Sequence, residues 1–431
     1  MKRDAHGMRL EIANGRVIDP ASGRDKEGSV YIADGMIAAL DKAPDGFRAD
    51  QTLDAKGLVV CPGLVDVSAR LREPGFEYKA TLESEMRAAV AGGVTTLACP
   101  PDTDPPLDEP GLVDMLRRRA KSLERARVYP VGALTVKLEG ATLTEMGLLA
   151  DAGCVAFSQA NVPLADTQVL WRALQYAATF GFSVWLRAED AWLGKSGVAH
   201  DGDVATRLGL PGIPAFAETI ALGTLLELVR ATRARVHICR LSSAGGVEMM
   251  RAAKKEGLPV SCDIGIHHLH LCDRDLGFFD SNCRLDPPLR SQRDRDALSQ
   301  ALADGVVDCV CSDHTPVDDD GKHLPFAEAE AGATGLELLL PLTLKWGAAR
   351  KLDLAQTLAR ITCDPARILG TASGRLAAGA PADITLFDPQ ASVRVSAESL
   401  KSQGKNTPFL GYELQGRVKA TIVNGNVVYE G

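Results

Sequence analysis

Histidine is scarce in this chain of 431 residues, which holds only eight, and none lies between His6 and His200. Its ten cysteines include no C-x-x-C pair, which argues against a zinc knuckle or a disulfide framework and is typical of buried thiols in a reducing compartment. No apolar run approaches the roughly 20 residues of a membrane span. The polar residues 1–7 lack the apolar core of a secretory signal. We therefore expect a cytoplasmic protein that does not enter membranes.

Strong charge of one sign is also missing. The chain has 48 Lys and Arg against 56 Asp and Glu, a formal net charge of −8. This mild excess of acid argues against a protein that binds nucleic acid or anionic membranes. With 45% hydrophobic and 24% charged residues, the composition is that of an ordinary globular protein and excludes a disordered or fibrous one.

Two β-rich ends flank a long middle region. Short alternating runs with Asp34-Gly35 and Asn424-Gly425 turns indicate hairpins in residues 9–60 and in the last fifty residues. We predict a small β-sandwich domain built from both termini, residues 1–61 and 371–431.

Between these ends, β-branched apolar runs alternate with segments of helical length and spacing. Eight strands are expected, at 65–71, 95–100, 127–134, 153–158, 183–188, 236–241, 259–266 and 306–312. Helices are expected at 81–90, 111–125, 167–179, 216–231, 246–255 and 293–303. Eight β-then-α units predict an α/β fold with a (β/α)8 TIM-type barrel over 62–370, whose functional residues follow the strands. A doubly wound sheet is the alternative architecture, but its Gly-x-Gly-x-x-Gly turn is missing.

Three local motifs carry little weight. Gly194-Lys195-Ser196 resembles the end of a phosphate-binding loop, but Glu189 stands where that loop needs glycine. No His-Glu-x-x-His or Gly-x-Ser-x-Gly occurs. The cluster of His267, His268 and His270 ends a predicted strand and is expected to be hydrogen-bonded rather than an independent zinc site.

Motifs at the strand ends are more specific. In order along the chain they are PGLVD (62–66), REPG (72–75), AGGVTT (91–96), VAFS (155–158), DPPLR (286–290), DH (313–314) and KNTPF (405–409). With these motifs the sequence resembles the dihydroorotases of the amidohydrolase superfamily over essentially its whole length. That resemblance implies hydrolysis or closure of a cyclic amide by one or two divalent metals, which make hydroxide from bound water.

The same resemblance implies a ligand set that this chain lacks. The family's histidine pair after strand 1 is replaced by Ser68 and Arg70, and its bridging Lys or Asp by Gln159. The histidines of strands 5 and 6 are replaced by Arg187 and Arg240. Only the strand-8 acid, Asp313, remains. Arginine has five donors, no acceptor and a permanent charge, so it cannot ligate a dication. We predict that no metal cofactor is bound and that the family's zinc is lost, leaving Asp313 as a vestigial catalytic residue.

Residues that the resemblance assigns to substrate binding are partly kept. Arg72 stands at the position of the arginine that holds the substrate carboxylate, and His314 follows the catalytic acid; both are predicted to bind a ligand, if any binds. Asp102 and Asp286 replace asparagines of the family and should repel an anionic substrate. An ion pair of Arg72, for instance with Glu73, is an alternative interpretation of that residue.

Arg70, Arg187 and Arg240 are expected to converge on Asp313, where they would neutralise it and form a local cluster of positive charge. An anion pocket is the alternative. A side chain that points away from Asp313 would contradict the first version.

The resemblance implies a role as well as a fold. Inactive dihydroorotase homologues occur as non-catalytic subunits beside the catalytic subunit of aspartate carbamoyltransferase, in de novo pyrimidine biosynthesis. We expect this chain to be such a pseudo-enzyme, an oligomeric assembly subunit with no nucleic-acid or membrane partner. The alternatives are an active cyclic-amide hydrolase with an atypical or metal-free site, and an anion-binding sensor built on the arginines.

Overall fold

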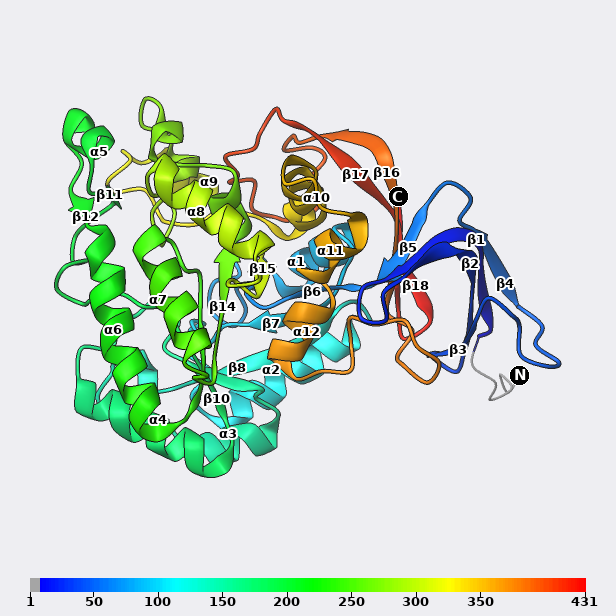
Figure 1. Cartoon of the computed structure of the whole chain (residues 1–431), viewed down its shortest axis with the longest axis horizontal. Helices are drawn as coiled ribbons and strands as arrows, with labels where there is room; N and C mark the ends of the chain where they lie inside the picture. The colour runs from blue at the N-terminus through cyan, green and yellow to red at the C-terminus, as the bar shows by residue number, and fades with distance from the viewer. Residues whose placement is uncertain (1–7) are drawn as a thin grey trace.

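The computed structural model describes residues 8–431; residues 1–7, which include His6 and the polar start of the chain, lie outside the described part. Two units are evident in Figure 1, a barrel surrounded by helices and, beside it, a β-sheet with strands from both terminal regions of the described chain. The expected fold class is therefore confirmed.

Eight parallel strands form the barrel, and each is bonded to the next barrel strand along the chain. The small β11–β12 pair is inserted between β10 and β13, which still pair directly with each other. All eight expected strands are present, mostly shorter than predicted. The wall closes where strand ends β6 and β15 meet, through a bridge between Ala69 and His314 and a bond from Ser312 N to Asp66 Oδ1 of 2.9 Å. The strands are β6 (Leu64–Asp66), β7 (Val94–Cys99), β8 (Arg127–Ala133), β9 (Ala156–Ser158), β10 (Ser183–Leu186), β13 (Arg235–Ile238), β14 (Val260–Gly265) and β15 (Cys309–Cys311).

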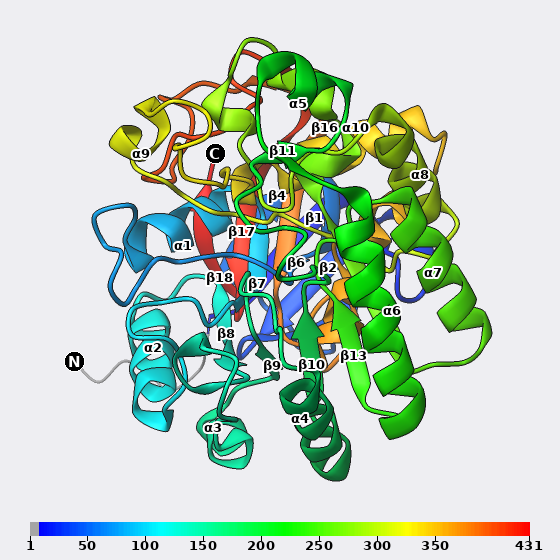
Figure 2. The ribbon, with the colours of Figure 1, turned by 90° about the vertical axis from the view of Figure 1, so that its left-hand side faces the viewer.

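Helices surround this barrel (Figure 2). The six expected ones are α1 (Leu82–Ala91), α2 (Pro110–Ser122), α4 (Thr167–Phe180), α6 (Ala215–Thr232), α7 (Ala244–Lys255) and α8 (Gln292–Ala303). Side-chain caps set the start of several of them; the Ser291 hydroxyl accepts the Asp294 N–H at the head of α8, for example.

Shorter elements were not predicted. They are α3 (Met146–Ala152), α5 (Asp203–Leu208), α9 (Asp319–His323), α10 (Leu339–Ala349), α11 (Leu354–Ala359), α12 (Cys363–Leu369), β11 (Ala199–His200) and β12 (Gly212–Ile213). Most are too short for periodicity to identify. Helix α10 is apolar on most of its surface, and its Pro341 lies in the first turn, where proline is tolerated.

The β-rich unit joins strands from both termini into one continuous sheet of eight strands rather than two separate sheets. The two ends of the chain meet where β5 pairs antiparallel with β16, with Cys61 opposite Thr385. The Asp34-Gly35 and Asn424-Gly425 turns have the positive φ angles that two-residue hairpins need. The strands are β1 (Leu10–Asp19), β2 (Arg24–Ala33), β3 (Met36–Leu40), β4 (Gln51–Asp54), β5 (Val59–Pro62), β16 (Ile384–Arg394), β17 (Glu413–Val423) and β18 (Asn426–Glu430). The domain boundaries stay a prediction.

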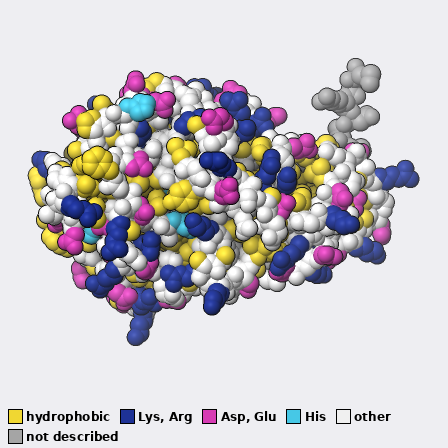
Figure 3. Space-filling model, turned by 90° about the horizontal axis from the view of Figure 1, so that it is seen from above, with side chains coloured by type: hydrophobic (Ala, Val, Ile, Leu, Met, Phe, Trp, Pro, Cys, Tyr) yellow, Lys and Arg dark blue, Asp and Glu magenta, His cyan; other side chains and the backbone are white. Residues whose placement is uncertain are grey.

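Burial and surface agree with a globular protein. All ten cysteines are free thiols, and eight of them are buried. The face shown in Figure 3 carries acidic and basic side chains interspersed, with no broad field of one sign. Within residues 8–431, no helix has both the length and the apolar character that crossing a membrane requires.

Candidate functional site at the barrel mouth

Asp313 lies just beyond β15 in the left-handed region of φ, at 46°, and its side chain is buried. Its Oδ1 accepts a hydrogen bond from Arg240 Nη1 at 3.1 Å and a longer one from Arg70 Nη1 at 3.5 Å. Arg240 follows β13 and Arg70 follows β6, so guanidinium groups from two different strands hold one carboxylate oxygen of Asp313.

The Arg70 guanidinium donates hydrogen bonds to four partners. Its Nε donates to Asp102 Oδ2 at 2.7 Å, and its Nη1 donates to Thr315 Oγ1 at 3.0 Å as well as to Asp313. Its Nη2 donates to Asn161 Oδ1 at 2.9 Å. The side chain is only 5% exposed, so these contacts fix the guanidinium inside the protein.

Asn161 connects the two arginines to a second acid. Its Oδ1 also accepts from Arg240 Nη2 at 2.6 Å, and its Nδ2 donates to Asp286 Oδ2 at 3.0 Å. Arg240 in turn donates to the backbone carbonyl of Asp286 at 3.3 Å. One amide therefore satisfies two guanidinium groups and one carboxylate at the same point.

Arg187 does not join Asp313. It follows β10 and pairs with Asp286 and with Glu189. The expectation that three arginines converge on Asp313 is thus wrong for Arg187. Asp286 and Glu189, which lies two residues after Arg187 in the chain, bind the Arg187 guanidinium instead. It still belongs to the same network, since Asp286 is shared with Asn161.

The two uncharged replacements at the former ligand positions lie apart from this network. Gln159 accepts from Thr135 Oγ1 at 2.9 Å and donates to the carbonyl of Leu138 at 2.7 Å. Ser68 is buried beside the closing strands, where its carbonyl accepts a 3.3 Å bond from Ser312 Oγ. Neither side chain is hydrogen-bonded to Asp313.

The charges of the network balance closely. Arg70, Arg187 and Arg240 carry three positive charges, while Asp102, Asp286, Asp313 and Glu189 carry four negative ones. The acids of this network therefore outnumber the three arginines that were expected to form a cluster of positive charge. Asp102 and Asp286, the two acids expected to repel a substrate, are partners of Arg70 and Arg187, and their effect on a substrate stays a prediction.

Burial and these partners act in opposite directions on the pKa values. Burial raises the pKa of Asp102, but Arg70 outweighs it and holds that pKa below its usual value. Burial likewise raises the pKa of Asp286, and Arg187 outweighs it. For Arg240, burial lowers the pKa while Asp313 raises it further, so the guanidinium stays charged. Asp102, Asp286 and Arg240 are therefore stabilised as ions by their partners in the network.

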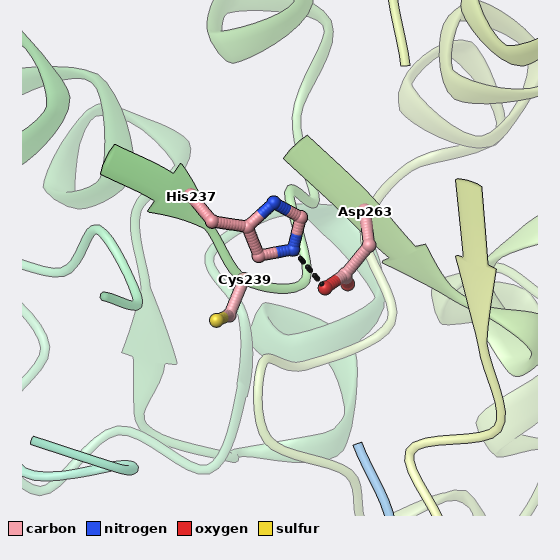
Figure 4. Close-up of side chains that lie close together, drawn as sticks. All are labelled: His237, Cys239 and Asp263. Atoms are coloured by element: carbon pink, nitrogen blue, oxygen red, sulfur yellow. Dashed lines mark hydrogen bonds and ion pairs between the residues drawn. The ribbon is translucent and has the colours of Figure 1, made fainter. Parts of the chain in front are cut away.

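A buried pair beneath the mouth positions Arg240. His237 Nε2 lies 2.8 Å from Asp263 Oδ2, as Figure 4 shows, and Asp263 Oδ1 accepts the backbone N–H of Arg240 at 2.8 Å. Arg240 has a φ of 53°, a conformation that needs such support in a residue other than glycine.

His237, Asp263 and Cys239 also have ligand atoms within 4.8 Å of one another, close enough to hold a metal ion. Both ring nitrogens of His237 are already bonded, Nδ1 to Ser261 Oγ at 2.8 Å. Burial, and secondarily Asp263, raises the pKa of the Cys239 thiol, which disfavours the thiolate that a metal requires. We interpret the three residues as structural.

The side chains at the former ligand positions do not fit a zinc centre. Zinc takes lone pairs from imidazole, thiolate or carboxylate groups. Arg70 and Arg240 present only N–H groups and direct them at Asp313, the one ligand of the family that the resemblance finds kept here. No catalytic step through zinc follows from this set of residues.

Arg72 and His314, the predicted ligand-binding residues, have different surroundings. Arg72 Nε donates to the carbonyl of Pro316 at 2.8 Å, and its guanidinium lies 5.9 Å from the centre of the Phe76 ring. Burial, and secondarily Arg70, lowers its pKa to about 10. Glu73, the suggested ion-pair partner, binds Arg119 instead. The ligand-binding role of Arg72 stays a prediction.

His314 points into the protein. Its Nε2 lies 2.6 Å from Glu85 Oε2, while its Nδ1 accepts the backbone N–H of Gly335 at 3.1 Å. Both ring nitrogens are thus taken by buried protein groups, which leaves neither for a ligand.

Sequence reasoning missed Asn161 altogether and did not foresee that Asp102 and Asp286 pair with arginines. A signal existed: two new acids occur together with three new arginines at strand ends that meet in a barrel. Asn161 offers no such signal, because a single amide in a loop is unremarkable until its neighbours are known.

Comparison with known proteins gives the family. A dihydro-orotase-like family model matches residues 57–245, and an amidohydrolase family model matches residues 198–429. A dihydroorotase-like protein of Pseudomonas aeruginosa is 46% identical over 424 residues, covering 98% of this chain and 100% of the relative. A dihydroorotase of Geobacter sp. (strain M21) is 41% identical over 426 residues, with 98% and 100% covered.

Solved structures agree on the fold. The L-hydantoinase (dihydropyrimidinase) of Arthrobacter aurescens superposes with a TM-score of 0.87 at 24% identity, over 98% of this chain and 96% of that one. A dihydropyrimidinase of Brevibacillus agri gives 0.83 at 22% identity, with 98% and 95% covered. From its relatives and its family models, the chain belongs to the dihydroorotase-like members of the amidohydrolase family.

Proposed function

We propose that this protein is a catalytically inactive dihydroorotase homologue of de novo pyrimidine biosynthesis, and that it serves as the non-catalytic assembly subunit of aspartate carbamoyltransferase. The observation that carries the first half is the binding of Arg70 and Arg240 to Asp313 at the barrel mouth. The second half rests on the resemblance to inactive homologues with that role.

The chemistry of the mouth supports inactivity. Hydrolysis of a cyclic amide needs a hydroxide, a polarised carbonyl and a group that moves the proton. Arginine at the ligand positions removes the usual source of the first two. Asp313, the one remaining candidate for the proton transfer, has an oxygen occupied by two guanidinium donors and a side chain that is 7% exposed.

The intact barrel around the altered mouth supports a role as a subunit. The strands, the helices and the closing contacts are intact around the altered mouth, and the arginines there are matched by acids rather than left unpaired. Selection for a folded scaffold with a useful surface would maintain such a barrel without its metal. The protein of Pseudomonas aeruginosa at 46% identity, and one of Pseudomonas putida at 43%, also bear the name dihydroorotase-like.

Metal content and turnover test the inactivity. Protein purified without chelator should contain far less than one zinc per chain by mass spectrometry and should not convert dihydroorotate or carbamoyl aspartate. Stoichiometric zinc together with turnover that Asp313→Asn abolishes would overturn this half of the proposal and favour an atypical hydrolase.

Co-expression tests the partner. The chain should elute with the aspartate carbamoyltransferase of its own organism in size-exclusion chromatography, in a complex larger than either protein alone. Elution of the two as separate species at micromolar concentrations would contradict the second half and leave the first untouched.

A further inference from the structure

A cleft lies on the side of the barrel away from the mouth, where the barrel meets the β-rich unit. It has a volume of about 610 Å³, within the range of small-molecule sites. The C-terminal half of α2 and the start of β8 form one wall, and the turn between β17 and β18 forms the other. These elements lie together in Figure 2, and a bond from Arg125 Nη1 to the carbonyl of Val428 joins them.

The lining of this cleft, which we call the basic cleft, is rich in cations. Five basic residues line it against two acids, Asp114 and Glu124, an excess of three positive charges in a chain whose net charge is −8. Of the five, Arg127 is the one that forms an ion pair within residues 8–431, with Asp383. Within residues 8–431, the other four have no carboxylate within 4.0 Å; they are Arg117, Arg118, Lys121 and Arg125. At the barrel mouth, by contrast, every arginine of the network has an acid.

Hydrogen bonds to backbone carbonyls position two arginines of the basic cleft and leave most of their N–H donors available for a ligand. Arg117 Nη1 donates to the carbonyl of Ala152 at 2.6 Å, and Arg125 uses Nη1 on Val428. Each guanidinium has five N–H donors, so most remain available. Tyr129, half-buried in the same wall, adds an aromatic face and a hydroxyl that is a donor at neutral pH.

We propose that the basic cleft binds a small organic phosphate that carries several negative charges. Guanidinium groups recognise phosphate through paired N–H donors, and several fixed cations favour a polyanion over a single charge. The aromatic wall favours a phosphate attached to a planar organic group. The acids Asp114 and Glu124 in the lining disfavour a long nucleic-acid backbone. The site is independent of the proposed function at the mouth, and it bridges the two units of the fold.

Calorimetric titration of the full chain tests this site. The probes are inorganic phosphate, pyrophosphate and adenosine triphosphate, at low ionic strength and without magnesium. We expect saturable 1:1 binding that tightens from phosphate to the triphosphate and weakens as salt is added. The double variant Arg118→Glu/Lys121→Glu should weaken binding of the triphosphate by about tenfold or more.

A matched control separates the site from general charge. Arg48→Glu/Arg394→Glu makes the same change of net charge at two exposed residues that do not line the basic cleft, and it should leave binding unchanged. Circular dichroism should show that both double variants are folded. Absence of saturable binding to all three probes, or an equal loss in both variants, would overturn the proposal. So would tighter binding of a single-stranded oligonucleotide than of the triphosphate.

Discussion

Arg240 and Asp313 lie 73 residues apart in the chain, yet their side chains meet at 3.1 Å in the buried mouth of the barrel. The resemblance assigns a metal-ligating histidine to the first position and a catalytic acid to the second. Here the pair is an internal ion pair, with Arg70 as a second donor to the same oxygen. Guanidinium groups of the protein itself therefore supply the positive charge beside Asp313.

Removing the charge of Asp313 should destabilise the fold. Asp313→Asn keeps the shape and suits the left-handed φ of 46°, but it leaves Arg70 and Arg240 facing a neutral amide. We expect the free energy of unfolding in urea to fall by about 3–5 kcal/mol, the usual cost of a broken buried pair. Asp25→Asn, which breaks the surface pair with Arg16, is the control and should cost less than about 1 kcal/mol. Equal effects of the two substitutions would contradict the interpretation.

The Asn161 amide should matter as much as a charged residue. Asn161→Ala removes the acceptor of Arg70 and Arg240 and the donor to Asp286 together. Leaving buried polar groups unsatisfied costs about 1–3 kcal/mol in general, and here three are affected. Urea unfolding of Asn161→Ala, of Arg240→Met and of the double variant measures this. Arg240→Met should lower the free energy of unfolding by less in the Asn161→Ala background than in the wild type. Strict additivity would show that the two side chains are not coupled.

The pattern of the fold could be predicted from the sequence because its period is regular. Most barrel strands lie within short apolar runs and most long helices have amphipathic spacing, so the eight strands and six helices could be located approximately. Short elements such as α5 and α12 could not be found, because six or seven residues contain too little periodicity. The small sheet was anticipated from both ends, while its continuity depends on β5 pairing with β16, which no local signal reveals.

The candidate site was predictable in its composition but not in its connections. Which residues stand at the ligand positions followed from the resemblance to the dihydroorotases, and that arginine cannot ligate a metal followed from its chemistry. The partner of each arginine depended on reach and direction: Arg187 lies nearer to Asp286 and Glu189 than to Asp313, and Asp102 meets the Nε of Arg70. Distances of a few ångströms between loops decide such pairings, and the sequence does not encode them separately.

His314 should act on stability rather than on ligand binding. Glu85 is fully buried and accepts from His314, from Ser402 Oγ at 2.6 Å and from the backbone N–H of Gln403 at 2.9 Å. Burial raises the pKa of Glu85, but His314 outweighs it, so the carboxylate depends on the imidazole. We expect His314→Ala to lower the free energy of unfolding by about 3 kcal/mol or more. His323→Ala, at an exposed residue, should change it by no more than about 0.5 kcal/mol. An unchanged stability of His314→Ala would return His314 to the candidates for ligand binding.

The network should also make the protein sensitive to acid. Asp102 and Asp286 have pKa values lowered in the folded state, so the unfolded chain binds their protons more readily. Their contribution to stability is therefore complete above the unfolded value of about 3.9 and is lost as the pH falls through the folded pKa. Urea unfolding from about pH 6 to pH 3 should show stability falling steeply below about pH 4.

Asp102→Asn should be less stable than the wild type at pH 6. Its free energy of unfolding should fall by less on acidification, because one of the groups that take up a proton is gone. The exposed Asp45→Asn should keep the wild-type profile, and an identical slope in Asp102→Asn would show that its pairing with Arg70 does not contribute to acid sensitivity.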